Sequence, residues 1–385
     1  MTTPPPVDPT PWADDDLSQA CQHHDLALTL QAQGLYGQAL DHGRKALSLM
    51  EQAVGPHHPD VANILNAASS LAATQGAYDE AQQMAQRAVA IMTPIDLPDE
   101  AIHRIRIQAY GALATARRMQ GRYHDAEPLF QQAIALAEDA FGPNSLEVAS
   151  ALNNLAILYK FTGNFAQAQR LYRRALRLTQ AHLGPHHVEV ASIYHNLGGL
   201  EHARGRYRRG EPLVRRAVVI REQALGPDHP AVAADIAALA AILDGQGRFE
   251  ASVPLYHRAL AIFEATFGPE HYDIAVNLNN LAVIAYEQGD AARAEHLYQR
   301  ALQIKEHVLG PDHVDVALTL YNLAVLNHHQ GQGETAEAHY RRALTLFERS
   351  LEATHPHVLA CRRQYNILLQ EKGRHDLTRA RESQA

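Results

Sequence analysis

The sequence has little of what marks secreted, membrane or disulfide-bonded proteins. Its 385 residues include two cysteines, Cys21 and Cys361, near opposite ends of the chain, and no hydrophobic run approaches the length of a membrane span. We expect both cysteines to be buried thiols that lie too far apart to bridge. The segment 1–12, MTTPPPVDPTPW, lacks the basic start and the apolar stretch of a leader peptide. We therefore expect a soluble, cytoplasmic protein.

An excess of positive charge is also missing. Lysine and arginine total 34 against 42 aspartate and glutamate residues, so the formal net charge is −8. Because no global positive field surrounds such a chain, we expect neither nucleic acid nor a membrane as its partner.

Familiar catalytic motifs are absent as well. The sequence contains no Gly-x-x-x-x-Gly-Lys phosphate loop, no His-Glu-x-x-His and no Gly-x-Ser-x-Gly. Each conspicuous polar residue instead recurs at a fixed spacing. We expect no catalytic residue, no cofactor and no metal, and we expect that the protein is not an enzyme.

What the sequence does contain is a glycine that returns at a fixed interval. It occurs every 42 residues, with one gap of 45, at Gly34, Gly76, Gly121, Gly163, Gly205, Gly247, Gly289, Gly331 and Gly373. A fixed period of this length indicates a solenoid of repeated units. Counting each unit from position 0, the place of Gly142 and Gly184, gives units that start at 13, 55, 100, 142, 184, 226, 268, 310 and 352. The recurring glycine then stands at position 21.

Each unit is predicted to be a pair of helices. Spacings of three and four place Val148, Leu152, Leu155, Ala156 and Tyr159 on one helical face, which predicts helix A over positions 4–19. Helix B follows the position 21 glycine and has alanine at position 33 in every complete unit, from Ala46 to Ala343. A residue of this size is expected where two helices cross closely.

The boundaries follow from this period. We expect a disordered segment over residues 1–12, a solenoid over residues 13–375, and a polar tail over residues 376–385. The last helix A, from about residue 356, is expected to end at Lys372-Gly373 and to cover the end of the array. Gly198 and Gly199 inside one helix A, with Gly210 in place of an alanine, predict a soft middle. Either drift in a tolerant repeat or a functional hinge explains them.

Several segments resemble known repeats. Leu152-Asn-Asn-Leu-Ala, Gly163-Asn-Phe-Ala-Gln-Ala and Leu171-Tyr-Arg-Arg-Ala-Leu resemble tetratricopeptide repeats, and the 42-residue length is similar to the kinesin light chain type. The resemblance implies an all-α, right-handed superhelical solenoid of helix-turn-helix repeats. It also implies that a concave groove, lined by the A helices, binds a peptide or an extended segment of a partner protein.

The groove residues can be predicted from the helix A pattern. If positions 6, 10, 13, 14 and 17 are buried, the stripe at positions 8, 12, 15 and 19 faces the groove. In the tetratricopeptide family an asparagine at the position matching 12 commonly bonds the backbone of a bound peptide. The candidate groove residues are Asn153, Asn154, Asn196, Asn279, Asn280 and Asn322. The alternative is that these amides hold neighbouring helices together. Because the stripe has no lysine or arginine, we expect a partner segment with apolar side chains.

Two further patterns allow two interpretations each. Histidine recurs at position 3, as His58, His187, His229, His271, His313 and His355. One ring per repeat is too widely spaced to share a metal ion, so a role in the loop before helix A is favoured, and acidification through pH about 6.5 is expected to loosen the stack. The arginines between Arg204 and Arg216 are interpreted as a solvated face, with docking of an acidic partner as the alternative.

The predicted function is a non-enzymatic scaffold that binds a protein or peptide partner in the groove. The alternative is a regulatory protein gated by a ligand or peptide, whose superhelix changes pitch on binding. The sequence leaves the partner's identity and the oligomeric state open.

Overall fold

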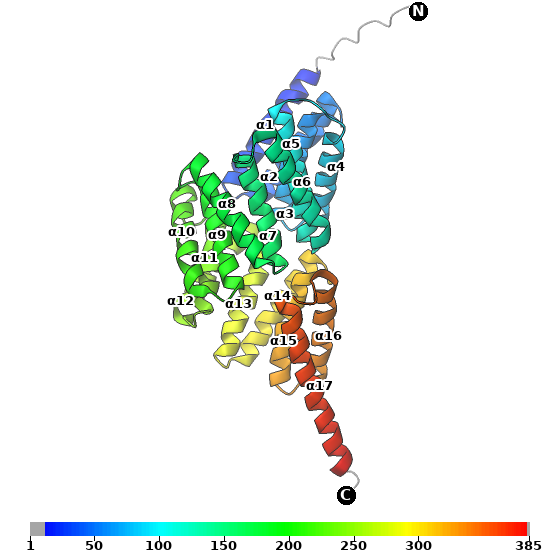
Figure 1. The fold of residues 1–385 in the computed structure, drawn as a ribbon, viewed down its shortest axis with the longest axis vertical. Helices are drawn as coiled ribbons and strands as arrows, with labels where there is room; N and C mark the ends of the chain where they lie inside the picture. Colours follow the sequence, from blue (N-terminus) through cyan, green and yellow to red (C-terminus); the bar gives the residue numbers. More distant parts are fainter. Residues whose placement is uncertain (1–11, 383–385) are drawn as a thin grey trace, which may run out of the picture. The chain divides into compact units, whose positions relative to one another are not determined.

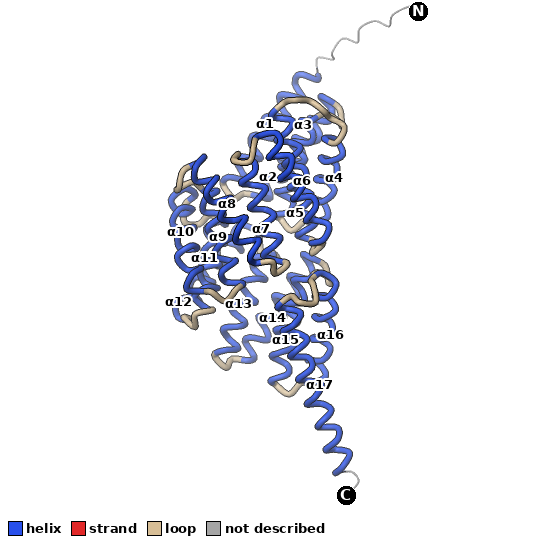
Figure 2. Tube along the Cα trace, viewed as in Figure 1, coloured by secondary structure: helices blue, strands red, loops and turns tan. Residues whose placement is uncertain are grey.

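Helices make up all the regular structure of the described chain. The computed structural model describes the backbone of residues 12–382 and the side chains within residues 15–373. Figure 1 shows the helices in chain order, and Figure 2 shows the short loops that join them. They are α1 (Trp12–Ala32), α2 (Tyr36–Val54), α3 (Pro59–Thr74), α4 (Tyr78–Met92), α5 (Glu100–Met119), α6 (Tyr123–Phe141), α7 (Leu146–Phe161), α8 (Phe165–Leu183), α9 (Val188–Ala203), α10 (Tyr207–Leu225), α11 (Pro230–Asp244), α12 (Phe249–Phe267), α13 (Tyr272–Glu287), α14 (Ala291–Leu309), α15 (Val314–His329), α16 (Gly333–Ser350) and α17 (Pro356–Glu382).

The chain divides into two compact units. One unit comprises residues 1–119 and 128–151, and the other comprises residues 120–127 and 152–385. Within each unit, consecutive helices pack against one another, as α1 does against α2 and α9 against α10. The single solenoid over residues 13–375 stays a prediction. Of the segment expected to be disordered, residues 1–11 lie outside the described residues, as do residues 383–385 of the expected tail.

The A helices begin where position 3 caps them. In α9 and α15 the Nδ1 atoms of His187 and His313 accept backbone N–H bonds from Glu189 and Asp315, at 3.2 Å and 3.0 Å. The same bond is made by His58, His229, His271 and His355. These caps satisfy a helix N–H group that has no partner within the helix, which confirms the predicted role in the loop before helix A. Helices α7, α9, α13 and α15 accordingly cover positions 4–19.

Glycine ends both helices of a repeat. Gly163 at position 21 and Gly184 at position 0 have φ angles of 80° and 82°. Only glycine adopts this left-handed conformation without a steric cost. The two recurring glycines therefore set the 42-residue period.

Small residues allow the two helices of a repeat to cross closely. The position 33 alanines are fully or almost fully buried, as predicted: Ala46, Ala88, Ala133, Ala175, Ala217, Ala259, Ala301 and Ala343. Neighbouring A helices also contact one another, as α9 contacts α11 and α11 contacts α13. Positions 9 and 16, for example Ile193 and Leu200, are therefore buried in addition to the predicted set.

Gly198 and Gly210 belong to one such crossing. A side chain at Gly198 would overlap a methyl group of the buried Val214, and a Cβ at Gly210 would lie 2.9 Å from Ile242 Cδ1 and 3.1 Å from the Gly198 carbonyl oxygen. The glycines thus permit α9 and α10 to approach, which neither of the two sequence interpretations anticipated. The predicted softness of this region stays a prediction.

Two local predictions were wrong. Cys361 is buried and burial raises the pKa of its thiol to about 12, but Cys21 is exposed, because it lies one residue, about 100° around α1, from the core-facing Ala20. The helix expected to end at Lys372-Gly373 continues to Glu382. Gly373 is not among the glycines with a positive φ. A single glycine costs a helix only about 1 kcal/mol and does not end it.

Candidate functional site

The helix A stripe, defined as positions 8, 12, 15 and 19 of the A helices, stays accessible. In α13, positions 6, 10, 13, 14 and 17 are all buried, whereas Val276, Asn280 and Val283 of the stripe are half-buried and Glu287 is exposed. The same pattern holds in α11 and α15. The predicted division of helix A into a buried face and a partly exposed stripe is confirmed for these helices.

Four of the six predicted asparagines lie at contacts between neighbouring A helices. Asn196 Nδ2 donates to Asn153 Oδ1 at 3.0 Å, which joins α9 to α7. Asn322 Nδ2 lies 3.4 Å from Asn279 Oδ1 and joins α15 to α13 in the same way. These amides therefore hold adjacent repeats together, as the alternative interpretation expected. Each such amide still has hydrogen-bonding groups beyond the one used in its pair.

The remaining two candidates have different surroundings. Asn154 is half-buried in α7. Asn280 is half-buried in α13 and lies by the Tyr256 hydroxyl, whose pKa is raised mainly by burial and is lowered in part by the Asn280 amide. Among the six candidates, only Asn279 is fully buried.

A buried lysine adjoins the pair of Asn279 and Asn322. Lys305 lies on α14, which is helix B of the repeat that contains Asn279. Its Nζ lies 3.0 Å from Thr319 Oγ1 and 3.2 Å from the Asp315 carbonyl oxygen. Thr319 Oγ1 in turn donates to Asn279 Oδ1 at 3.2 Å. Burial lowers the pKa of Lys305, and the nearby Asp315 opposes part of that decrease. A chain of hydrogen bonds thus runs from the buried Lys305 side chain to the amides at the stripe.

An ion pair occupies the equivalent place two repeats earlier. Arg221 Nη1 donates to Asp235 Oδ1 at 2.6 Å, and Arg221 Nη2 donates to Ser192 Oγ at 2.6 Å. The same Asp235 oxygen lies 2.7 Å from His195 Nδ1. Asp235 is fully buried, whereas the His195 side chain is 29% exposed. The carboxylate therefore holds the imidazole in one orientation beside the stripe.

The serine hydroxyl in this cluster is not arranged as a nucleophile. The Ser192 hydroxyl accepts from Arg221 and donates to the Val188 carbonyl, so His195 does not activate it. Within the described residues, no three His, Cys, Asp or Glu side chains are grouped so that they could hold a metal ion.

The sequence interpretation missed both clusters. That interpretation rests on residues that recur at one position of the repeat, whereas Arg221, Lys305 and Asp235 differ from the residues at the same position in other repeats. Position 37 otherwise carries Met50, Met92, Ala137, Thr179, Phe263 and Phe347, and Asp235 stands in the apolar run PAVAADIAALAAILD. The two clusters could have been found from the sequence by looking for a charged residue at a repeat position that is otherwise mostly apolar. The stripe itself carries no lysine or arginine, but the B helices supply the buried basic side chains Arg221 and Lys305 beside it.

A contact between distant repeats also lies in the second unit. His355, in the loop before α17, donates from Nε2 to the Phe161 carbonyl at the end of α7, 194 residues away, at 3.2 Å. Its Nδ1 accepts the His357 N–H at 3.2 Å, so both ring nitrogens are engaged. A Cβ at Gly163 would lie 3.1 Å from the same ring. Burial, followed by the nearby His357, lowers the pKa of His355 to about 4.

Comparisons with known proteins agree with the repeat architecture. A profile of the tetratricopeptide repeat matches residues 18–93, 106–181, 189–265, 232–307, 273–332 and 315–385. A search of curated proteins gives no significant match. None of the described helices is long and apolar enough to cross a membrane.

Three solved structures illustrate the similarity in fold. The Rap conjugation gene regulator of plasmid pLS20, in complex with the Phr* peptide, shares 15% identity at a TM-score of 0.61, over 80% of each chain. A Rap protein complexed with Competence and Sporulation Factor shares 13% identity at a TM-score of 0.59, over 88% of this chain and 99% of that one. BtubC (BKLC) from P. vanneervenii shares 21% identity at a TM-score of 0.44, over 67% of this chain and 94% of that one.

Proposed function

Because the chain belongs to the tetratricopeptide repeat family, we propose that it is a non-enzymatic protein-interaction scaffold that binds an extended segment of a partner along the helix A stripe. The observation that carries this proposal is the recurrence of a partly exposed amide at position 12 of four A helices, as Asn154, Asn196, Asn280 and Asn322, with Ala238 at that position in α11. An amide offers both donors and acceptors, so it can pair with any peptide unit regardless of the side chain.

The contacts behind the stripe support the same function. The bonds between Asn196 and Asn153, and between Asn322 and Asn279, fix the orientation of these amides before a ligand arrives. Fixed groups lose less conformational entropy on binding than mobile ones. The half-buried valines Val276 and Val283 flank Asn280, which favours a segment with apolar side chains.

The fold is compatible with this use. One structure of similar fold was solved with the Phr* peptide bound. That likeness supports the architecture, whereas the choice of ligand here rests on the residues of the stripe.

A peptide selected from a random display library against the purified protein tests the proposal. We expect Asn280→Ala and Asn322→Ala each to weaken binding of that peptide about fivefold, the effect of losing a hydrogen bond worth about 1 kcal/mol. Asn164→Ala is the matched control, because Asn164 is exposed at the start of α8 and its side chain makes no capping bond. Isothermal titration calorimetry measures the affinities. Unchanged affinity in both stripe variants, with unchanged melting temperatures, would reject the stripe as the binding site.

A gated regulator is the second candidate, and the contact of His355 with Phe161 favours it. This contact joins segments 194 residues apart, so it depends on the pitch of the intervening repeats. A ligand that changed the pitch would break or form it. Small-angle scattering with and without the selected peptide distinguishes the candidates, since a passive scaffold keeps its profile and a regulator does not.

A further inference from the structure

The second unit carries a concentration of positive charge that contrasts with the rest of the chain. Residues 165–216 contain ten arginines, three glutamates, no lysine and no aspartate, a net charge of +7 in a chain whose total is −8. Arg170, Arg173 and Arg177 are exposed on α8 at spacings of three and four, and therefore lie on one side of that helix.

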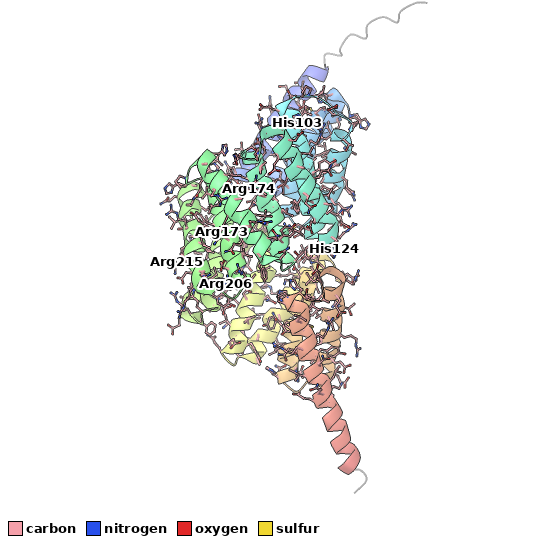
Figure 3. The ribbon with its side chains drawn as sticks, viewed as in Figure 1. His103, His124, Arg173, Arg174, Arg206 and Arg215 are labelled. Carbon is pink, nitrogen blue, oxygen red and sulfur yellow. The ribbon has the colours of Figure 1, made fainter. Side chains whose placement is uncertain are left out.

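Helix α10 continues this surface. Arg208 and Arg215, and likewise Arg209 and Arg216, are seven residues apart and exposed, and Arg206 is exposed just before the helix. Arg173 and Arg215 both occupy position 31, so the two B helices present the same side. Figure 3 labels Arg173 and Arg174 on α8 and Arg206 and Arg215 at α10. We name the exposed arginines of residues 165–216 the arginine face.

Part of this charge arises because a repeated ion pair is interrupted here. In other repeats the arginine at position 32 pairs with a glutamate at position 38 of the preceding B helix, as in Arg258 with Glu222 at 3.1 Å and Arg342 with Glu306 at 2.6 Å. In α10 this arginine is Arg216, but the preceding helix has Gln180 at position 38. The Gln180 amide donates to the Tyr194 hydroxyl instead, at 3.2 Å. Arg216 therefore keeps a positive charge that its counterparts share with a carboxylate.

Glu211 provides a carboxylate at the edge of the face. It accepts from Gln246 and pairs with Arg215 and Arg248, and these contacts lower its pKa. Glu211 is thus neutralised without Arg206, Arg208 or Arg209, whose positive charges remain available to a partner.

Two hollows lie on the arginine face. The hollow on α8 has a volume of about 560 Å³, and Leu171 lies among the arginines that line it. The hollow at the start of α10 has a volume of about 650 Å³ and is lined by Tyr207 between arginines. Gly245 is required there, because a side chain at that residue would overlap the Tyr207 ring. Both hollows combine apolar surface with guanidinium groups.

We infer that the arginine face binds a short acidic segment of a partner protein. Guanidinium groups form paired hydrogen bonds with carboxylates, and residues 165–216 contain ten arginines and no lysine. Residues 217–385 carry 15 lysines and arginines against 21 acidic residues, so a long polyanion or a charged membrane would extend over like charge. A short segment avoids this repulsion. The exposed Val219 on α10 adds an apolar contact that a protein side chain can use.

A fluorescein-labelled synthetic peptide of about twelve residues, mostly glutamate with two leucines, is the probe. We expect fluorescence anisotropy to show binding that weakens as NaCl rises from about 20 mM to about 200 mM. The triple variant Arg173→Gln, Arg209→Gln, Arg216→Gln is expected to bind about tenfold more weakly, from three surface charge contacts of modest strength each. Melting temperature confirms that the variant is folded.

The matched control removes the same charge elsewhere in the same unit. Arg293→Gln, Arg349→Gln, Arg363→Gln changes three exposed arginines outside the face, and we expect it to retain the affinity of the unaltered protein. Equal losses in both triple variants would show an effect of net charge alone and overturn the inference. Failure of the peptide to bind at about 100 µM in low salt, or tighter binding of duplex DNA or anionic vesicles, would also overturn it.

This inference is independent of the proposed function. The arginine face lies on B helices, whereas the stripe lies on A helices. Asn280→Ala and Asn322→Ala should therefore leave binding of the acidic peptide unchanged. Loss of that binding in the asparagine variants would place the acidic segment on the stripe and overturn the inference.

Discussion

Replacing Gly198 with alanine tests whether α9 and α10 require glycine where they cross. In an isolated helix this change would stabilise the folded state by about 1 kcal/mol, because alanine has the higher helix propensity. Here the new methyl group would overlap a methyl of Val214, which is fully buried. Overpacking of a core costs about 1–3 kcal/mol. We expect the overlap to exceed the propensity gain, so that Gly198→Ala lowers the free energy of unfolding.

The neighbouring glycine provides the control. Gly199 lies in the same helix, but a Cβ there would have only Lys160 Nζ nearby, at 3.5 Å. Gly199→Ala should therefore stabilise the protein by about 0.5–1 kcal/mol. Urea unfolding followed by far-ultraviolet circular dichroism measures both changes. Because the two substitutions share the same propensity gain, the difference between them reports the overlap with Val214.

A double variant isolates the cause further. Val214→Ala alone should destabilise the protein by leaving a cavity. In combination with Gly198→Ala it should cost less than the sum of the single changes, because the added methyl then occupies vacated space. Equal stabilisation by Gly198→Ala and Gly199→Ala would refute the reasoning and restore sequence drift as the explanation for the glycine pair.

Two further predictions follow from the buried polar groups. Asp235→Asn leaves the Arg221 guanidinium buried without its carboxylate and should lower the free energy of unfolding by about 3–5 kcal/mol. The double variant that also carries Arg221→Met should recover part of this loss. A loss below about 1 kcal/mol in urea unfolding of Asp235→Asn would contradict the prediction. The folded-state pKa of His355, about 4, lies below the usual 6.5, so the folded protein binds fewer protons than the unfolded chain between these values. The stabilisation by neutral His355 is therefore fully present above pH about 6.5 and decreases as the pH falls toward 4. His355→Asn does not titrate, and its melting temperature should decrease less between about pH 7 and pH 5 than that of the unaltered protein; parallel curves would exclude His355 as the source.

Much of the fold could be predicted from the period of the sequence. The bounds of α7, α9 and α13 match positions 4–19, the position 33 alanines are buried, and the position 3 histidines act in the loops before helix A. These features depend on residues within one unit or on its immediate neighbour. A repeat places the same residue in the same surroundings each time, so the pattern contains the necessary information.

The candidate site was less predictable. The six asparagines were located from the period, but the pairing of Asn322 with Asn279, and its link to Lys305, depends on which side chains converge between α13, α14 and α15. Polar groups between repeats take whichever donors and acceptors lie within reach. Period alone does not specify those distances.

The sequence by itself determined that this protein is a series of helical pairs, since glycine at two positions and apolar residues at helical spacing leave the backbone little choice. Only the tertiary structure decided which exceptions to the repeat act together. Arg221 of one repeat meets Asp235 of the next repeat, and His355 reaches Phe161 across 194 residues. The first contact depends on which side chains stand opposite one another where two repeats meet. The second depends on the accumulated rotation of one repeat upon the next, which is small per repeat and adds up only when the repeats are stacked.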